Sequence, residues 1–288
     1  MIDSVFQLLF RHEAPISEKQ IAMFHGYTKT RDLEMLQGIL KTDHRFHSCR
    51  DNLWQCAPLS ELIPDDKISE IDFIITDIES TGSLRGTDRI IDLAAVKIRN
   101  GQEIGRFESL VNPQKEISDQ IVRLTGITNE AVSTAPTIEE ILPKFIEFVD
   151  KGIFVAHNSL FDYHFINAEI RRLQLPELES RMEICTFRLA KKLLPDVRAR
   201  GVSGLAEYYN YTLENRHRAM PDVLATKYYF EQFLEELGKQ DIHNLHQLVL
   251  FQKEIITKKK IKKKIKSFLR KKAHFASSKG KRGSYEHK

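Results

Sequence analysis

Two carboxylates, separated by one residue, end a strongly apolar segment. Phe73, Ile74 and Ile75 lead into Asp77 and Glu79. The apolar run predicts a buried strand, and residues two apart in a strand share a face. The two carboxylates therefore project together, and they repel each other unless a cation lies between them. The pair predicts a site for a hard divalent cation. The alternative is that acids end the strand for solubility.

Two later segments bring further acids and a histidine. An apolar run over 153–156 leads into a helix whose first turn contains Asp162, where the helix dipole favours a negative charge. His217 precedes Pro221, which suits a first helical turn, and Asp222 then lies on that helix. Taken singly, Asp162 is also explained as a capping acid and His217 as a structural histidine.

The elements that position these residues predict an α/β domain. The apolar runs over 90–98 and 107–111 predict two strands in addition to the one that starts at 73. Apolar residues repeat at helical spacing over 138–149, and 153–156 predicts a further strand. Three consecutive strands followed by alternating helices and strands indicate a mixed sheet flanked by helices.

Together these segments resemble the DnaQ-like 3′–5′ exonucleases that carry four acids and a histidine. The resemblance covers residues 71–238 and includes Leu124–Thr128 between the first two motifs. Within the family, the likeness is to the epsilon-type proofreading subunit of bacterial DNA polymerase III and its stand-alone relatives. The resemblance implies an RNase H-like fold.

The resemblance also implies a mechanism. Asp77, Glu79, Asp162 and Asp222 would hold two Mg²⁺ or Mn²⁺ ions, with His217 as general base. Two cations about 4 Å apart hold the attacking and leaving oxygens of a phosphoryl displacement. A neutral imidazole, whose ordinary pKa is about 6.5, accepts a proton at neutral pH. The family often has an acid or a small residue where this chain has Pro221. This difference leaves the orientation of the Asp222 side chain open.

The implied reaction is release of nucleoside 5′-monophosphates from single-stranded or frayed DNA 3′ ends, in proofreading or repair. Gly82 has no Cβ, so its backbone can approach the 3′-terminal nucleotide closely. The full set of implied substrate contacts is Ile78, Thr81, Gly82, His157, Asn158 and Phe161. An RNA 3′-trimming exonuclease of the same fold is the alternative enzyme, because the sequence does not show whether a 2′-OH is accepted.

The residues before the nuclease predict a second, smaller domain. Residues 1–60 show helical apolar spacing three times, followed by alternation around a turn at 50–52. Three helices and a hairpin resemble a winged-helix domain. A non-enzymatic nucleic-acid-binding regulator built on this domain is therefore a third hypothesis. Residues 61–70, which contain Pro64, predict a linker.

Residues 239–288 predict a helical and then lysine-rich tail. The chain has a net charge of +4, but residues 253–288 hold 15 Lys and Arg against two acids. That segment carries +13 and the rest −9. Such a tail predicts a polyanionic partner, with a basic amphipathic helix over about 254–272, or alternatively a solvated, disordered segment.

One short motif suggests a protein partner. Gln247, Leu248, Leu250 and Phe251 resemble the pentapeptide by which bacterial replication proteins bind the sliding clamp. The alternative is a helix that packs on the nuclease. Proofreading would also require a replicative polymerase subunit, since the chain shows no polymerase section.

Composition excludes several classes of protein. Hydrophobic residues make up 41% and charged residues 29%, which excludes collagen-like and wholly disordered chains. No apolar run reaches the roughly 18–20 residues of a membrane span, and the N-terminus does not resemble a signal peptide. With only three cysteines, the sequence predicts a cytoplasmic protein with no membrane partner.

Overall fold

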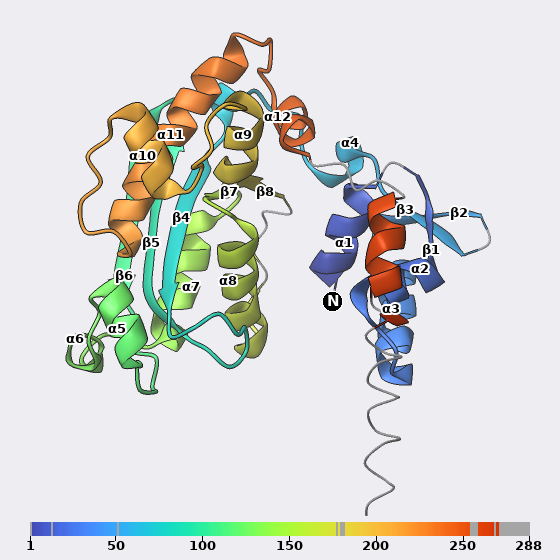
Figure 1. Cartoon of the computed structure of the whole chain (residues 1–288), viewed down its shortest axis with the longest axis horizontal. Coiled ribbons are helices and arrows are strands. Elements are labelled where there is room, and N and C mark those ends of the chain that lie inside the picture. Colours follow the sequence, from blue (N-terminus) through green and yellow to red (C-terminus); the bar gives the residue numbers. More distant parts are fainter. Residues whose placement is uncertain are drawn as a thin grey trace, which may run out of the picture. The chain divides into compact units, whose positions relative to one another are not determined.

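The computed structural model describes residues 2–12, 14–50, 52–176, 178, 182–253, 259–267 and 269–270. The chain divides into two compact units. The central unit is Ile63–Gln252, and the terminal unit combines Met1–Leu62 with Lys253–Lys288 (Figure 1). These two units differ from the predicted division, which placed a linker over 61–70 and ended the nuclease at 238. The expected tail beyond 270 lies outside the described residues.

The first six elements of the terminal unit are, in chain order, a helix, a strand, two helices and two strands. Three helices and a hairpin are present where the sequence predicts them, and β1 adds a strand. The sheet is antiparallel, with β3 between β1 and β2. The elements are α1 (Ile2–Phe10), β1 (Ile16–Ser17), α2 (Glu18–His25), α3 (Thr30–Thr42), β2 (Phe46–Arg50), β3 (Leu53–Cys56) and α4 (Leu59–Leu62).

Local signals set these boundaries. Ser17 caps α2 through a capping box with Gln20, which satisfies backbone donors that a helix start leaves unpaired. Gly26 ends α2 with a left-handed φ of 78°. Asn52 turns the hairpin with a φ of 61°, a conformation that asparagine tolerates well. The core of the unit is apolar and includes Val5, Leu8, Leu9, Ile16, Ile21, Leu36, Leu40 and Trp54.

The central unit is a five-stranded mixed sheet, which confirms the predicted α/β class. The strand order is β6-β5-β4-β7-β8. The pairs β4–β5 and β5–β6 are antiparallel, whereas β4–β7 and β7–β8 are parallel. The strands are β4 (Phe73–Ser80), β5 (Ile90–Arg99), β6 (Gln102–Leu110), β7 (Ile153–Ala156) and β8 (Glu183–Cys185).

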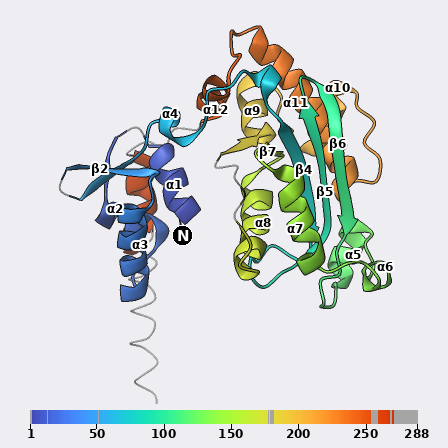
Figure 2. The same cartoon turned by 180° about the vertical axis from the view of Figure 1, so that it is seen from behind.

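Helices cover both faces of this sheet (Figures 1 and 2). On one face, Ile74 and Ile78 of β4 pack with α7 and α8 in a single apolar cluster. On the other face, Phe73 stacks edge-on against Phe230 of α11 at 5.0 Å between ring centroids. Because residues alternate along a strand, Asp77 and Glu79 share the face of Phe73 and look toward α11. The helices are α5 (Asp119–Thr125), α6 (Asn129–Ser133), α7 (Ile138–Val149), α8 (Leu160–Arg172), α9 (Thr186–Leu193), α10 (Val202–Tyr209), α11 (Ala219–Gly238) and α12 (Leu245–Gln252).

The helix α12 belongs to the central unit. Its last residue, Gln252, accepts a hydrogen bond from the Cys185 backbone N–H (2.8 Å) and donates one to the Glu183 carbonyl (2.7 Å). The side chain therefore pairs the open edge of β8, whose backbone groups would otherwise lack partners. Among the described residues, no helix combines the length and apolar character required to cross a membrane.

Candidate active site

Three segments from different elements meet at the end of β4. Glu79 lies on β4, Asp222 lies in the first turn of α11, and His217 lies in the loop before that helix. One ligand atom from each of these three side chains lies within 4.8 Å of the others. Asp77 shares the strand face of Glu79, and its charge interacts with those of Asp162, Glu79 and Asp222.

Asp162 joins the group from the other side of the sheet. It lies in the first turn of α8, and its carboxylate accepts a hydrogen bond from the Ile78 backbone N–H at 3.3 Å. Only 3% of Asp162 is exposed. A capping role alone would place this acid at the surface of its own helix. Here it contacts the strand residue between Asp77 and Glu79.

Burial and mutual repulsion raise the pKa of these carboxyl groups. Burial, and then the charges of Asp162 and Glu79, raise the pKa of Asp77 well above its ordinary value. Burial and Asp222 raise the pKa of Glu79 to about 8, and burial raises that of Asp162 to about 7. Burial also raises the pKa of Asp222. Clustered carboxyl groups with raised pKa values are a recurring property of functional sites.

The donor set fits hard divalent cations. Four carboxylates supply only oxygen ligands, which Mg²⁺ and Mn²⁺ prefer. One oxygen of Asp222, Oδ1, is buried and has no hydrogen-bond partner in the described structure. A buried acceptor of this kind is costly unless a cation or water pairs it. The acidic group is therefore suited to bind metal.

His217 is held in a strained backbone conformation beside the acids. Its φ is +63°, which is uncommon for a residue other than glycine. Its backbone N–H donates to Oδ2 of Asp222 at 3.2 Å, which fixes the loop relative to α11. Burial, and then Arg216, lower the pKa of the His217 imidazole. The ring is therefore neutral at pH 7, as a proton acceptor must be.

Asp92 belongs to this site but is absent from the set predicted above. It lies on β5 directly across from Glu79, and it is 1% exposed. Its Oδ2 accepts hydrogen bonds from Nε of Arg218 (3.0 Å) and from the Ala219 backbone N–H (3.2 Å). One signal was visible in the sequence, because Asp92 is a single acid inside the apolar run over 90–98.

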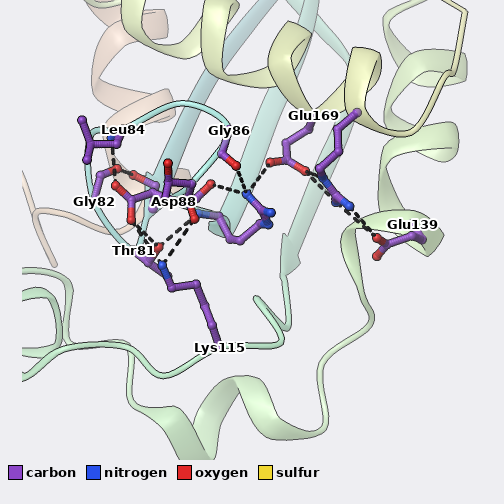
Figure 3. Close-up of polar contacts among 12 residues, drawn as sticks. Thr81, Gly82, Leu84, Gly86, Asp88, Lys115, Glu139 and Glu169 are labelled. Carbon is purple, nitrogen blue, oxygen red and sulfur yellow. Dashed lines mark hydrogen bonds and ion pairs between the residues drawn. The ribbon is translucent and has the colours of Figure 1, made fainter.

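The loop between β4 and β5 is closed by Asp88 (Figure 3). Its carboxylate accepts hydrogen bonds from the Leu84 backbone N–H (2.8 Å), the Thr81 hydroxyl (3.3 Å) and Lys115 (3.4 Å). A Cβ added to Gly82 would lie 2.5 Å from this carboxylate. In this structure the missing Cβ of Gly82 makes room for Asp88, whereas the sequence interpretation assigned that room to a nucleotide.

An ion-pair chain ties the same loop to two helices (Figure 3). Arg89 donates to the Gly86 carbonyl (3.1 Å) and lies 3.6 Å from the buried carboxylate of Glu169 on α8. Arg172 bridges Glu169 (2.7 Å) and Glu139 of α7 (3.2 Å). The loop that contains Thr81 and Gly82 is therefore anchored on α7 and α8.

The remaining predicted substrate contacts have partners inside the unit. His157 pairs through Nδ1 with the Thr186 hydroxyl (2.9 Å), and burial lowers its pKa to about 4. Asn158 adopts a left-handed φ of 62° at the turn into α8. Phe161 packs on the core and lies 5.6 Å from the Phe165 ring. These contacts position the start of α8, the helix that carries Asp162.

The sequence around this site matches a known family of enzymes. The exonuclease family model named RNase T matches residues 74–230, more than half of the chain. The chain belongs to this exonuclease family. The match spans β4 to the middle of α11, so it contains every element that carries the acidic group.

Relatives and solved structures agree with this exonuclease assignment. A PolC-type DNA polymerase III of Caldanaerobacter subterraneus subsp. tengcongensis is 38% identical over 192 residues, which cover 66% of this chain and 14% of the polymerase. The chain thus spans about one seventh of that relative. Exonuclease X in complex with 5′ overhanging duplex DNA has 25% identity and a TM-score of 0.50, covering 62% of this chain and 99% of that one. Escherichia coli exonuclease I in complex with a dT13 oligonucleotide shares the fold, with 18% identity, a TM-score of 0.51, and coverage of 57% of this chain and 41% of that one.

The clamp-like segment of this exonuclease is part of α12. Gln247 caps the helix start, since its side-chain oxygen accepts from the backbone N–H groups of His243 (2.8 Å) and Asn244 (3.2 Å). Leu248 is fully buried, whereas Leu250 is 51% exposed. Phe251 lies under the ammonium group of Lys192, 5.4 Å from its ring centroid. This arrangement is the packed helix of the alternative interpretation, and the motif would have to leave the helix to offer its anchors to a clamp.

Proposed function

We propose that the protein is a metal-dependent 3′–5′ exonuclease that releases nucleoside 5′-monophosphates from DNA 3′ ends. The observation that supports this most directly is the meeting of Glu79, His217 and Asp222 within 4.8 Å at the end of β4. Asp77 and Asp162 complete the group from both sides of the same strand. A non-enzymatic regulator would have no use for four carboxylates held together against their own repulsion.

The four carboxylates would hold two Mg²⁺ or Mn²⁺ ions. When bound, such ions lower the pKa of coordinated water and neutralise charge on the phosphate. His217 stays neutral at pH 7 and accepts the proton that the attacking water loses. Its backbone N–H bond to Asp222 holds the His217 loop against the start of α11. The anchored loop over 81–89 leaves Thr81 and Gly82 beside the acidic group, where the terminal nucleotide would lie.

DNA is the substrate that the comparisons favour over RNA. The similar exonuclease structures were solved with overhanging duplex DNA and with a dT oligonucleotide. The likeness to a PolC-type polymerase favours proofreading or repair, with a polymerase as the partner for proofreading. We also propose that the first 62 residues form a winged-helix-like module, since their element order is that of a winged helix.

The test uses single strands labelled at either end, with Mg²⁺ or Mn²⁺. The 3′-labelled strand should release labelled mononucleotide at once, and the 5′-labelled strand should shorten progressively. Asp77→Asn should reduce the rate at least about 10³-fold, since several kcal/mol of transition-state stabilisation are lost. His217→Ala should reduce the rate while metal binding persists.

Controls make this result specific. Glu147→Gln removes an exposed acid of α7 and should leave the rate unchanged. Release of mononucleotide from the 5′ end first would contradict the proposed polarity. A faster rate on matched RNA than on DNA would establish the RNA-trimming alternative.

A further inference from the structure

The described part of the lysine-rich tail is a helix that packs within the terminal unit. Residues 259–267 and 269–270 are helical. Ile261 is 3% exposed, and Nζ of Lys264 lies 3.8 Å from the ring centroid of Phe24 in α2. Lys253 lies over the ring of Phe10 in α1, at 4.9 Å. The tail helix is therefore a further helix of the N-terminal fold.

The rest of this unit has little positive charge of its own. Residues 1–62 contain seven Lys and Arg and eight Asp and Glu, a net charge of −1. Residues 253–288 supply +13. Phosphate binding requires a concentration of cations on one surface. Among the described residues of this unit, the tail helix provides such a concentration.

Five of the seven cations in the described part of the helix lie on one face. Lys259, Lys262, Lys263, Lys266 and Arg270 follow the spacing i, i+3, i+4, i+7 and i+11, which is one side of an α-helix. All five are exposed, whereas Ile261 lies on the opposite side. The helix thus packs through Ile261 and Lys264 and presents a basic stripe, defined here as these five residues.

We propose that residues 1–62 and the tail helix form one composite module that binds the phosphates of duplex DNA through the basic stripe. This binding goes beyond the exonuclease activity, because it uses neither the acidic group nor a 3′ end. Charge complementarity selects a polyanion as the partner. A membrane surface is disfavoured, because among the described residues of the helix Ile261 is buried, Ile265 is half-buried, and Leu269, 49% exposed, is a single apolar side chain rather than the broad apolar face that enters lipid.

The test measures binding of the full chain to a blunt 20-base-pair duplex in EDTA, over a range of salt concentrations. The variant K262Q/K263Q/K266Q should weaken binding at low salt. It should also reduce the slope of log K against log salt by about 2 to 3, since each phosphate contact contributes about 0.9. The matched control K144Q/K151Q/K239Q removes three exposed lysines of the central unit and should retain the slope.

A second variant tests whether the module is composite. The one tryptophan, Trp54, is buried in the terminal unit, so its fluorescence reports that unit alone. Ile261→Asp should lower the melting temperature of the terminal unit, as followed by Trp54 fluorescence, and weaken duplex binding. An unchanged melting temperature, or an unchanged slope in the triple lysine variant, would overturn the proposal. Equal loss of binding to anionic lipid vesicles would overturn the choice of partner. Hydrolysis of a four-nucleotide strand should stay constant in both variants, which separates this test from that of the exonuclease.

A different observation supports a second inference, within the proposed exonuclease site. The Asp92 carboxylate accepts hydrogen bonds from the Arg218 side chain and from the first backbone N–H of α11. In the chain, His217 comes directly before these two groups and Asp222 shortly after them. We infer that Asp92 is a positioning residue: through Arg218 it fixes the orientation of the His217 and Asp222 side chains. The constraint matters because His217 has a left-handed φ of 63°, a conformation that residues other than glycine adopt only rarely.

The test compares Asp92→Asn and Arg218→Ala, singly and together, on single-stranded DNA. Each should lower kcat by about 10- to 100-fold with little change in KM, as is typical of groups that orient catalytic ligands. The double variant should lose no more than the worse single variant. Added guanidinium should restore part of the activity of Arg218→Ala but none of the double variant. A rise in KM alone, or additive losses, would overturn the inference.

Discussion

In the central unit, four carboxyl groups lie close together, two of them buried and two half-buried, whereas in the terminal unit five cations lie along an exposed helix face. Water screens the exposed cations, so their repulsion costs little and they can meet phosphates without a fixed geometry. The buried acids are desolvated, and they raise one another's pKa. A bound cation or a proton offsets that cost, so the arrangement fixes a reaction at one point while weakening the metal-free fold at neutral and higher pH.

The largest expected effect separates activity from stability in the central unit. Asp77→Asn should abolish hydrolysis yet raise the melting temperature of the metal-free protein, because it removes one charge from a repelling cluster. The gain is expected to be about 1–2 kcal/mol, and saturating Mg²⁺ should erase it, since the wild-type site then gains binding energy. Calorimetry in EDTA and in Mg²⁺ measures both states.

Glu147→Gln, which removes an exposed acid of α7, serves as the control and should shift neither melting temperature. If Asp77→Asn melts below the wild type in EDTA, the acids do not repel one another as their burial suggests. The clustered acids would then not destabilise the metal-free central unit.

The second prediction concerns the pH response of the central unit without metal. The pKa is about 8 for Glu79 and about 7 for Asp162, above their ordinary values of 4.5 and 3.8. Folding therefore favours the protonated forms, so stability is greatest in acid and falls as pH rises from about 4 to 8. The summed loss should reach several kcal/mol. Hydrogen exchange of peptides from β4 and β7 measures this loss of stability as a function of pH. Bound Mg²⁺ should remove the pH dependence above pH 7.

Much of the central site could be predicted from the sequence because its signals are local. Alternation places Asp77 and Glu79 on one face, and an apolar strand followed by a helix start places Asp162. These patterns depend on two or three neighbouring residues. The mixed sheet follows from the same kind of evidence, as the order of apolar runs shows.

What the sequence did not predict depends on contacts between distant residues. Asp92 and Arg218 are 126 positions apart, and no periodicity links them. The strand β8 has only three residues, and its edge is paired by Gln252, 67 positions beyond Cys185. The tail helix was expected as a basic amphipathic helix, but nothing local indicated that α1 and α2, at the other end of the chain, would supply its partner.

The smallest expected effect is the opposite pH response of the terminal unit. Burial, and then Lys264, lower the pKa of His25 to about 4 from 6.5. The folded unit therefore favours the neutral ring, and its stability is full above pH 6.5 and lost as pH falls toward 4. The loss is at most about 3.5 kcal/mol, since one pKa unit corresponds to about 1.4 kcal/mol. Trp54 fluorescence during chemical denaturation measures it without contribution from the central unit. His25→Phe should flatten this pH dependence, whereas His44→Phe, at an exposed position, should preserve it. A parallel loss of stability with rising pH in both units would mean that burial of the His25 ring does not set the acid response, and the contrast between the units would be lost.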